Sequence, residues 1–251
     1  MFDLTGKVAI VTGSSKGIGR AIVEALARAG AKVVVSSRTG EACEEVASAL
    51  RKDGREAVAI ACHMGRRDEV NALAERTRAH YGKIDILVCN AAVNPYFGPL
   101  TGLTDEAFDK VMGINVRSNL WLANLVQPEM AARRDGVIII VSSIGGLKGT
   151  DSLGVYAISK AADMQLARNL AVEWGPHNIR VNCIAPGLVR TDFARALWGN
   201  PKWLEATEKK TPLRRIGEPD DIAGAAVFLA SRAGSWMTGQ TIVIDGGVTI
   251  A

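Results

Sequence analysis

The stretch KVAIVTGSSKGIG, residues 7–19, decides the fold. A short β-branched apolar run ends at Thr12, glycines follow in a GxxxGxG spacing, and a helical pattern begins at once. Glycines at such a turn let the backbone approach a pyrophosphate, which then binds the free N–H groups of the helix N-terminus. The stretch therefore predicts a dinucleotide site formed by Gly13, Ser15, Lys16, Gly17, Ile18 and Gly19.

The same alternation of strand and helix continues along the chain. Further strand-like apolar runs cover residues 32–37, 56–62, 84–90, 136–143, 179–186 and 240–246. Helical patterns between the strands include residues 19–30, 41–54, 104–130 and 155–174. Most of the apolar runs are continuous, as in strands that are buried on both faces. Repeated β-α-β units with right-handed crossovers imply a three-layer, Rossmann-type α/β fold with one doubly wound parallel sheet of about seven strands. No linker is visible, so we predict a single domain over residues 1–251.

Composition and charge argue against several classes of function. The chain has 251 residues and a net charge of +4, and its basic residues are scattered, so we expect no nucleic-acid partner. No apolar run reaches the roughly 18 residues of a membrane span, and the N-terminus does not resemble a signal peptide, so we expect a cytoplasmic protein without a membrane partner. The 4 cysteines and 3 histidines show no metal-ligand spacing, which predicts reduced thiols and no metal site.

A second signal is Tyr156, followed four residues later by Lys160 in the sequence YAISK. Positions i and i+4 share one face of a helix, so the phenol and the ammonium can point at the same place. A positive charge there favours the phenolate form, which makes an acid–base role for the tyrosine feasible. Taken alone, the motif is explained more simply by an exposed tyrosine and an unrelated lysine.

Two further polar residues favour the acid–base hypothesis. Ser143 ends the apolar run GVIIIVSS, at the edge where ligands bind in doubly wound sheets, and its hydroxyl can donate to a carbonyl oxygen. The alternative for a serine at a strand end is turn capping, which we expect of the neighbouring Ser142. Asn115 lies on an otherwise apolar helix and is either a satisfied core amide or part of a hydrogen-bond chain to the site.

Together these motifs resemble the short-chain dehydrogenase/reductase family over the whole chain. The matching segments are TGSSKGIG (12–19), NAA (90–92), Asn115, Ser143, YAISK (156–160) and APGLVRT (185–191). The resemblance implies hydride transfer between a nicotinamide cofactor and a ketone or secondary alcohol. It implies a catalytic tetrad in which Tyr156 transfers the proton and Lys160 promotes its ionisation and binds the nicotinamide ribose. Ser143 would polarise the carbonyl, and Asn115 would hold a water that leads from Lys160 towards solvent.

The end of the second strand indicates which cofactor binds. In the family, an Asp at the position of Ser37 binds the adenine-ribose hydroxyls of NAD, whereas Ser37 and Arg38 offer a hydrogen bond and a fork suited to a phosphate. With Lys16 nearby, we predict NADP(H), preferred over NAD(H) by about tenfold or more. The remaining cofactor contacts that the resemblance implies are His63, Met64, Asn90, Ala91, Ala92, Tyr156, Lys160, Pro186, Gly187, Val189 and Thr191.

Two positions depart from the family pattern. The motif NNAG reads Cys89-Asn90-Ala91-Ala92 here, and we expect binding to survive because Asn90 is kept. His63 stands where an Asp often meets the adenine amino group. The imidazole either takes over that hydrogen bond or packs as an ordinary residue at the adenine edge.

Residues 187–214 are the least periodic segment and follow a strand end, so we predict that they form a lid over the substrate. The stretches VVVSSR, NAAVNPYFG, FARALW and LRRIGEP resemble the carbonyl and retinal reductases of the peroxisomal type and their bacterial relatives. The resemblance implies a bulky or aromatic carbonyl substrate. The predicted pocket wall is Tyr96, Phe97, Ser143, Leu147, Leu153, Phe193, Leu197 and Trp198. Trp203 belongs either to this wall or to the core of the lid.

Two other functions stay open. A 3-oxoacyl-thioester reductase shares the fold and the tetrad, and it would need a basic patch for an acidic carrier protein, for which Arg117, Arg133 and Arg134 are candidates. A non-catalytic dinucleotide sensor would have no need of the intact Tyr156 and Lys160. The resemblance also implies a homotetramer.

Overall fold

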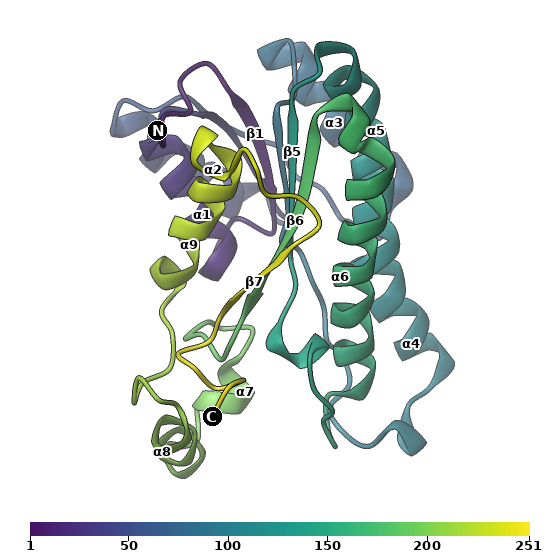
Figure 1. The fold of residues 1–251 in the computed structure, drawn as a ribbon, viewed down its shortest axis with the longest axis vertical. Coiled ribbons are helices and arrows are strands. Elements are labelled where there is room, and N and C mark those ends of the chain that lie inside the picture. The colour runs from purple at the N-terminus through teal and green to yellow at the C-terminus, as the bar shows by residue number, and fades with distance from the viewer.

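The centre of the molecule is a sheet of seven parallel strands in the order β3-β2-β1-β4-β5-β6-β7 (Figure 1). The computed structural model describes residues 1–251. The strands are β1 (Val8–Thr12), β2 (Lys32–Ser36), β3 (Ala57–Ala59), β4 (Ile86–Cys89), β5 (Gly136–Val141), β6 (Ile179–Pro186) and β7 (Thr241–Ile244). The predicted doubly wound α/β fold is confirmed.

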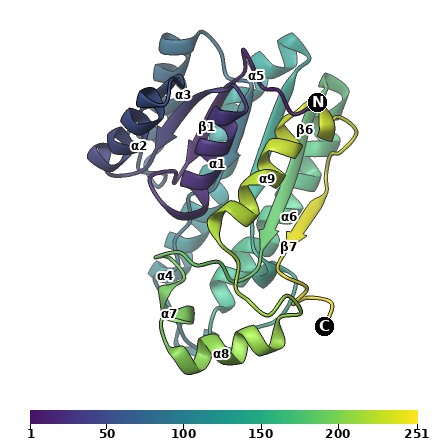
Figure 2. The same ribbon diagram turned by 90° about the vertical axis from the view of Figure 1, so that its left-hand side faces the viewer.

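Helices cover both faces of the sheet. One layer contains α1, α2 and α9, and the opposite layer contains α3, α4, α5 and α6 (Figures 1 and 2). The helices are α1 (Gly17–Arg28), α2 (Gly40–Lys52), α3 (Arg67–Tyr81), α4 (Asp105–Met112), α5 (Ser118–Arg133), α6 (Gly154–Trp174), α7 (Arg195–Trp198), α8 (Pro201–Lys210) and α9 (Pro219–Ala230). Each layer buries its own apolar cluster against the sheet, which explains why the strands are apolar on both faces. None of these helices combines the length and the apolar character that crossing a membrane requires.

The order of the strands fixes the place of a ligand site. From β1 the chain runs outward through β2 to β3, and then returns to the other side of β1 to build β4 to β7. Strands β1 and β4 are therefore neighbours, although their connections lead to opposite sides of the sheet. Crevices at the carboxyl ends of strands at such a switch point are the usual ligand sites of open α/β sheets.

Several element boundaries differ from the sequence-based expectations. The predicted helix over residues 104–130 consists of α4, a π-helical turn η2 (Gly113–Arg117) and α5. Strand β3 is only three residues long, and β5 ends at Val141, two residues before Ser143. Apolar character does not define where ladder hydrogen bonds stop, so strand ends are the least predictable part of a pattern. The segment 187–214 contains the short helices α7 and α8.

Candidate active site

A cavity of about 780 Å³ opens at the carboxyl ends of the strands, on the side where the segment 187–214 lies. Its wall combines the turn after β1 with residues that follow β2, β4, β5 and β6. All of the predicted cofactor residues line it: Gly13, Ser15, Lys16, Gly17, Ile18, Gly19, Ser37, Arg38, His63, Met64, Asn90, Ala91, Ala92, Tyr156, Lys160, Pro186, Gly187, Val189 and Thr191. Residues that are far apart in the sequence therefore meet in one place.

The turn after β1 has the tight geometry that the glycine spacing predicts. Gly13 and Gly17 have positive φ angles of 66° and 57°, a conformation that side chains with a Cβ rarely adopt. At Gly19 a Cβ would lie 2.3 Å from the carbonyl oxygen of Gly13. The helix α1 begins at Gly17, so its free N–H groups face the space that these glycines leave open. This cradle fits the pyrophosphate of a dinucleotide.

Asn90 holds the glycine turn against the end of β4. Its side-chain Nδ2 donates to the carbonyl oxygens of Thr12, at 2.9 Å, and Gly13, at 3.0 Å. The Thr12 hydroxyl accepts in return from the backbone N–H groups of Asn90 and Ala91, at 3.0 and 3.1 Å. None of these four bonds involves Cys89 or Ala92, the two positions that depart from the family motif NNAG. Both substitutions are therefore compatible with an ordered turn.

Two cationic side chains line the cavity near its first two strands: Lys16 in the turn after β1 and Arg38 after β2. Arg38 is exposed and forms no ion pair, while Lys16 Nζ lies 3.5 Å from Asp192 Oδ2 with its side chain 70% exposed. The Ser37 hydroxyl lies 3.0 Å from Cys43 Sγ. No carboxylate follows β2 before Glu41, so Arg38 and Ser37 give the end of β2 a positive charge and a hydroxyl. Lys16 adds a second positive charge, which Asp192 partly offsets. That combination suits a phosphate group.

His63 lies at the cavity edge in a fixed orientation. Its backbone N–H donates to Glu69 Oε2 at 2.7 Å, and its ring Nδ1 accepts from the N–H of Gly65 at 3.1 Å. Because Nδ1 is used as an acceptor, Nε2 is the ring nitrogen left for a ligand. The neighbouring Met64 is buried against Cys62.

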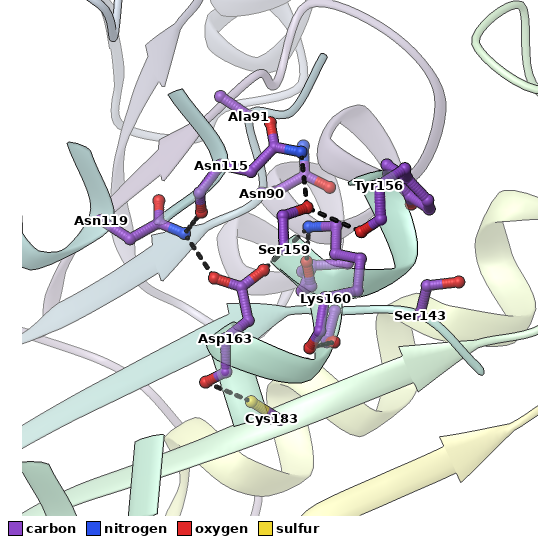
Figure 3. A network of polar contacts seen from close by, with 12 residues as sticks. Asn90, Ala91, Asn115, Asn119, Ser143, Tyr156, Ser159, Lys160, Asp163 and Cys183 are labelled. Atoms are coloured by element: carbon purple, nitrogen blue, oxygen red, sulfur yellow. Dashed lines mark hydrogen bonds and ion pairs between the residues drawn. The ribbon is translucent and has the colours of Figure 1, made fainter. Parts of the chain in front are cut away.

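Tyr156 and Ser143 face the cavity from different elements (Figure 3). Tyr156 lies in the first turn of α6, and its ring centroid is 6.0 Å from that of Phe193 in the segment 187–214. Ser143 caps the short helix η3 (Ile144–Gly146), because its hydroxyl oxygen accepts from the N–H of Gly145 at 3.0 Å. Turn capping was expected of Ser142, whose hydroxyl instead donates to the carbonyl of Lys160 at 2.7 Å. In this cap the Ser143 hydroxyl only accepts a hydrogen bond. Its own proton therefore stays available for a hydrogen bond to a substrate oxygen.

Lys160 lies below Tyr156 in the floor of the cavity. Its side chain is 2% exposed, and Nζ donates to the carbonyl of Val141 at 2.9 Å and to Asp163 Oδ2 at 3.0 Å. Nζ is 5.7 Å from the centroid of the Tyr156 ring. Burial alone lowers the pKa of the Lys160 ammonium, but the charges of Asp163 and Tyr156 and the hydrogen bond to Asp163 raise this pKa above its usual value. An ammonium has three N–H bonds, so one donor remains for a ligand.

Asn115 is fully buried in the π-helical turn and does not line the cavity. Its Oδ1 accepts from the N–H of Val93 at 2.8 Å, and its Nδ2 donates to the Val93 carbonyl and to Ser159 Oγ, both at 3.0 Å. Ser159 Oγ donates in turn to the carbonyl of Tyr156 at 2.7 Å. The Asn115 side chain thus connects the loop after β4 to the helix that carries Tyr156. No hydrogen bond joins the Asn115 side chain to Lys160 Nζ.

The predicted substrate wall is present only in part. Phe97, Leu153, Phe193 and Leu197 line the cavity together with Ser143. Four other candidates lie outside its lining. The Tyr96 hydroxyl donates to the carbonyl of Pro99 in its own loop, and Trp198 Nε1 donates to the carbonyl of Thr191. Leu147 is 49% and Trp203 is 54% exposed, and neither lines the cavity.

Sequence reasoning missed several residues at the site. Asn94 and Lys148 line the cavity and add an amide and an ammonium to its wall. Asn119 and Asp163 lie behind Lys160, where Asn119 Nδ2 donates to Asp163 Oδ1 at 3.1 Å (Figure 3). The available signal was a pair of polar residues on apolar helices, Asp163 three positions after Lys160 and Asn119 four positions after Asn115.

Doubly wound sheets that join a glycine cradle to a tyrosine and a lysine four residues apart belong to oxidoreductases that bind a nicotinamide dinucleotide. The chain belongs to the short-chain dehydrogenase/reductase family. The family model described as "Enoyl-(Acyl carrier protein) reductase" matches residues 13–249. Dehydrogenase/reductase SDR family member 4 from Sus scrofa is 43% identical over 244 residues, which cover 97% of this chain and 88% of that protein. The human protein of the same name is 42% identical over the same length.

Solved structures share the whole fold. A gluconate 5-dehydrogenase from Burkholderia cenocepacia in complex with NADP and tartrate superposes with a TM-score of 0.95 at 33% identity, covering 100% of this chain and 98% of that one. A 7α-hydroxysteroid dehydrogenase complexed with NADH and 7-oxo glycochenodeoxycholic acid gives a TM-score of 0.94 at 39% identity, covering 98% and 95%. Both nicotinamide dinucleotides thus occur among proteins similar to this one.

Proposed function

We propose that the protein is an NADP(H)-dependent carbonyl reductase that acts on bulky or aromatic ketones and the corresponding secondary alcohols. The observation that carries the proposal is that Tyr156, Lys160 and Ser143 line the same cavity as the glycine cradle with Lys16 and the end of β2 with Arg38. Family membership supports the type of reaction, and the cavity supports the cofactor and the substrate class.

The residues of the site divide the chemistry between them. NADPH, when bound, supplies the hydride. Tyr156 donates its phenolic proton to the carbonyl oxygen as the alcohol forms, and Ser143 donates a hydrogen bond to the same oxygen. The positive charge of Lys160 stabilises the phenolate that Tyr156 becomes. In alcohol oxidation the proton moves in the opposite direction, and the phenolate acts as the base.

The preference for NADP(H) rests on the charges at the adenosine end. Arg38 and Lys16 would bind the 2′-phosphate, and Ser37 offers a hydroxyl where a carboxylate would repel it. The NADP in the gluconate 5-dehydrogenase complex supports this choice. The hydroxysteroid dehydrogenase complex contains NADH, so the test compares turnover with both cofactors.

The substrate class rests on the apolar side chains above Tyr156. Phe97, Leu153, Phe193 and Leu197 offer a wall for a ring or a long chain, and Ile144 adds to it. The sequence stretches shared with carbonyl and retinal reductases point to the same class. The alternative, a 3-oxoacyl-thioester reductase, needs a basic patch, and of its three candidates only the exposed Arg134 forms neither an ion pair nor a contact with an aromatic ring. Arg133 forms ion pairs with Glu129 and Asp85, and Arg117 lies over the Trp121 ring.

The test is a turnover screen with NADPH and NADH against aryl ketones, α-diketones and an acetoacetyl thioester. We expect turnover of the aryl ketones and diketones with NADPH, and a rate at least about 10³-fold lower after Tyr156→Phe. A substrate profile led by the thioester would replace this proposal with the alternative. We also propose a cytoplasmic homotetramer, which sedimentation and fractionation can test.

A further inference from the structure

A buried carboxylate lies directly behind Lys160. Asp163 is 0% exposed, and both of its oxygens are engaged: Oδ2 accepts from Lys160 Nζ at 3.0 Å, and Oδ1 accepts from Asn119 Nδ2 at 3.1 Å (Figure 3). Asn119 Nδ2 also donates to the carbonyl of Asn115 at 2.5 Å, which ties this amide to the π-helical turn. The Cys183 thiol donates to the Asp163 carbonyl at 3.5 Å.

Neither cofactor binding nor proton transfer explains Asp163. It does not line the cavity, and it lies on a helix face that otherwise packs apolar side chains such as Met164 and Ala167. Burying a carboxylate is costly, and leaving out one member of a buried pair is costlier still. An apolar residue at position 163 would avoid the cost of burying the carboxylate but would leave the buried Lys160 ammonium without its partner. The group that gains from the carboxylate is Lys160.

We propose that Asp163, held in place by Asn119, is a positioning residue that keeps Lys160 protonated and its ammonium fixed below Tyr156 into the alkaline range. The inference rests on the proposed function, since the ammonium matters there for the ionisation of Tyr156. Asp163 itself touches neither substrate nor cofactor and acts only through Lys160.

Asp163 is the carboxylate that offsets the charge of Lys160. The titratable groups that face the pair are Tyr156 on α6, Cys89 on β4 and Cys183 on β6, and Arg168 lies further along α6. Burial raises the pKa of both thiols, that of Cys183 to about 12, so neither carries a charge in the neutral range. Arg168 is exposed and stays charged throughout.

The ionisation state of the pair follows from its contacts. Burial raises the pKa of the Asp163 carboxyl, while Lys160 and Asn119 act in the opposite direction. We assign the ionised carboxylate because two donors, one of them an ammonium, meet its two oxygens. With Asp163 uncharged, burial would act on Lys160 without compensation, and its ammonium would lose its proton at lower pH.

The first experiment compares the wild-type protein, Asp163→Asn and the control Glu173→Gln, which removes a charge from an exposed part of the same helix. The readout is kcat/KM for alcohol oxidation as a function of pH. We expect kcat/KM to fall at alkaline pH as Lys160 loses its proton. The pH of this fall should be lower by at least about one unit in Asp163→Asn and unchanged in the control. A purely structural role would lower the rate at every pH without moving the decline, and that result overturns the proposal.

The second experiment reads the proton on Lys160 without any turnover. Only the neutral amine reacts with acetic anhydride, and Lys160 borders the cavity, so its rate of acetylation against pH can be followed by peptide mass spectrometry. We expect the midpoint of this curve to fall by at least about one unit in Asp163→Asn. If the proposed reaction is absent but the midpoint moves, only the proposed function fails. An unmoved midpoint refutes the role of Asp163 whatever the activity.

Asn119→Ala keeps the test decisive if Asp163→Asn does not fold. This variant leaves the carboxylate with one donor fewer, so we expect a smaller shift of the acetylation midpoint in the same direction. An unchanged midpoint in a folded Asn119→Ala protein would show that Asn119 does not hold the Asp163 carboxylate in place for Lys160. A wild-type midpoint below that of an exposed lysine such as Lys202 would contradict the proposal without any variant.

Discussion

Replacing Arg38 by leucine tests how the protein chooses its cofactor. Arg38 is exposed and has no ion-pair partner, so the substitution removes one positive charge without breaking a contact within the protein. A charge-assisted hydrogen bond contributes about 1.5 to 3 kcal/mol, and exposure to solvent places this one at the lower end. Lys16 remains, although Asp192 competes for it at 3.5 Å. About 1.4 to 2 kcal/mol corresponds to a loss of about 10- to 30-fold in kcat/KM with NADPH.

NADH lacks the 2′-phosphate, so its kcat/KM should stay within about twofold of the wild-type value. The assay follows nicotinamide absorbance with both cofactors at a fixed ketone concentration. Arg55→Leu, at an exposed position outside the cavity, is the matched control and should change neither value. Ser37→Asp should reduce the NADPH rate further, because it places a carboxylate beside the phosphate. An equal loss with both cofactors in Arg38→Leu would refute the assignment of Arg38 to the 2′-phosphate.

Three further substitutions probe the glycine cradle, the hydrogen bond to the substrate carbonyl and the N-terminal cap of α9. Gly19→Ala should weaken NADPH binding at least about tenfold by fluorescence titration, because its Cβ would lie 2.3 Å from the Gly13 carbonyl oxygen; unchanged binding would contradict the cradle. Ser143→Ala should lower kcat by about 10²- to 10³-fold and leave the Kd for NADPH unchanged, which separates substrate polarisation from cofactor binding. Hydrogen bonds from the Arg215 side chain and the Glu218 N–H hold the pKa of Asp221 at about 2, below its usual 3.8. Their contribution to stability is present above about pH 4 and is lost as the pH falls through about 2, so Asp221→Asn should lower the Tm at pH 7 but not at pH 2; an equal decrease at both values would show that the lowered pKa is not the cause.

The sequence was sufficient for the parts of the site that the backbone alone determines. Residues that follow parallel strands meet at one edge of the sheet, so Asn90, Ser143 and Gly187 share a cavity although they are far apart in the chain. The glycine spacing defined the turn after β1, and the four-residue spacing of Tyr156 and Lys160 put both on one face of α6.

The sequence was insufficient where the rotation of helices and loops decides the contacts. Asn119 and Asp163 are 44 residues apart and meet only because α5 and α6 turn these faces towards each other. Tyr96 and Trp198 have the size expected of a pocket wall, but local hydrogen bonds to the carbonyls of Pro99 and Thr191 hold them outside it. The π-helical turn at Asn115 was hidden because one inserted residue does not alter an apolar pattern enough to be seen.

Transfer of deuterium to an aryl ketone from NADPH that carries deuterium at both C4 positions is the most direct test of the proposed reaction, with the product alcohol analysed by mass spectrometry. We expect one deuterium on the carbinol carbon with the wild-type protein. With Tyr156→Phe, whose NADPH binding is checked by fluorescence titration, we expect a rate at least about 10³-fold lower. Product without deuterium, or a Tyr156→Phe protein that transfers it at the wild-type rate, would contradict the assignment of Tyr156 as the proton donor of an NADPH-dependent carbonyl reductase.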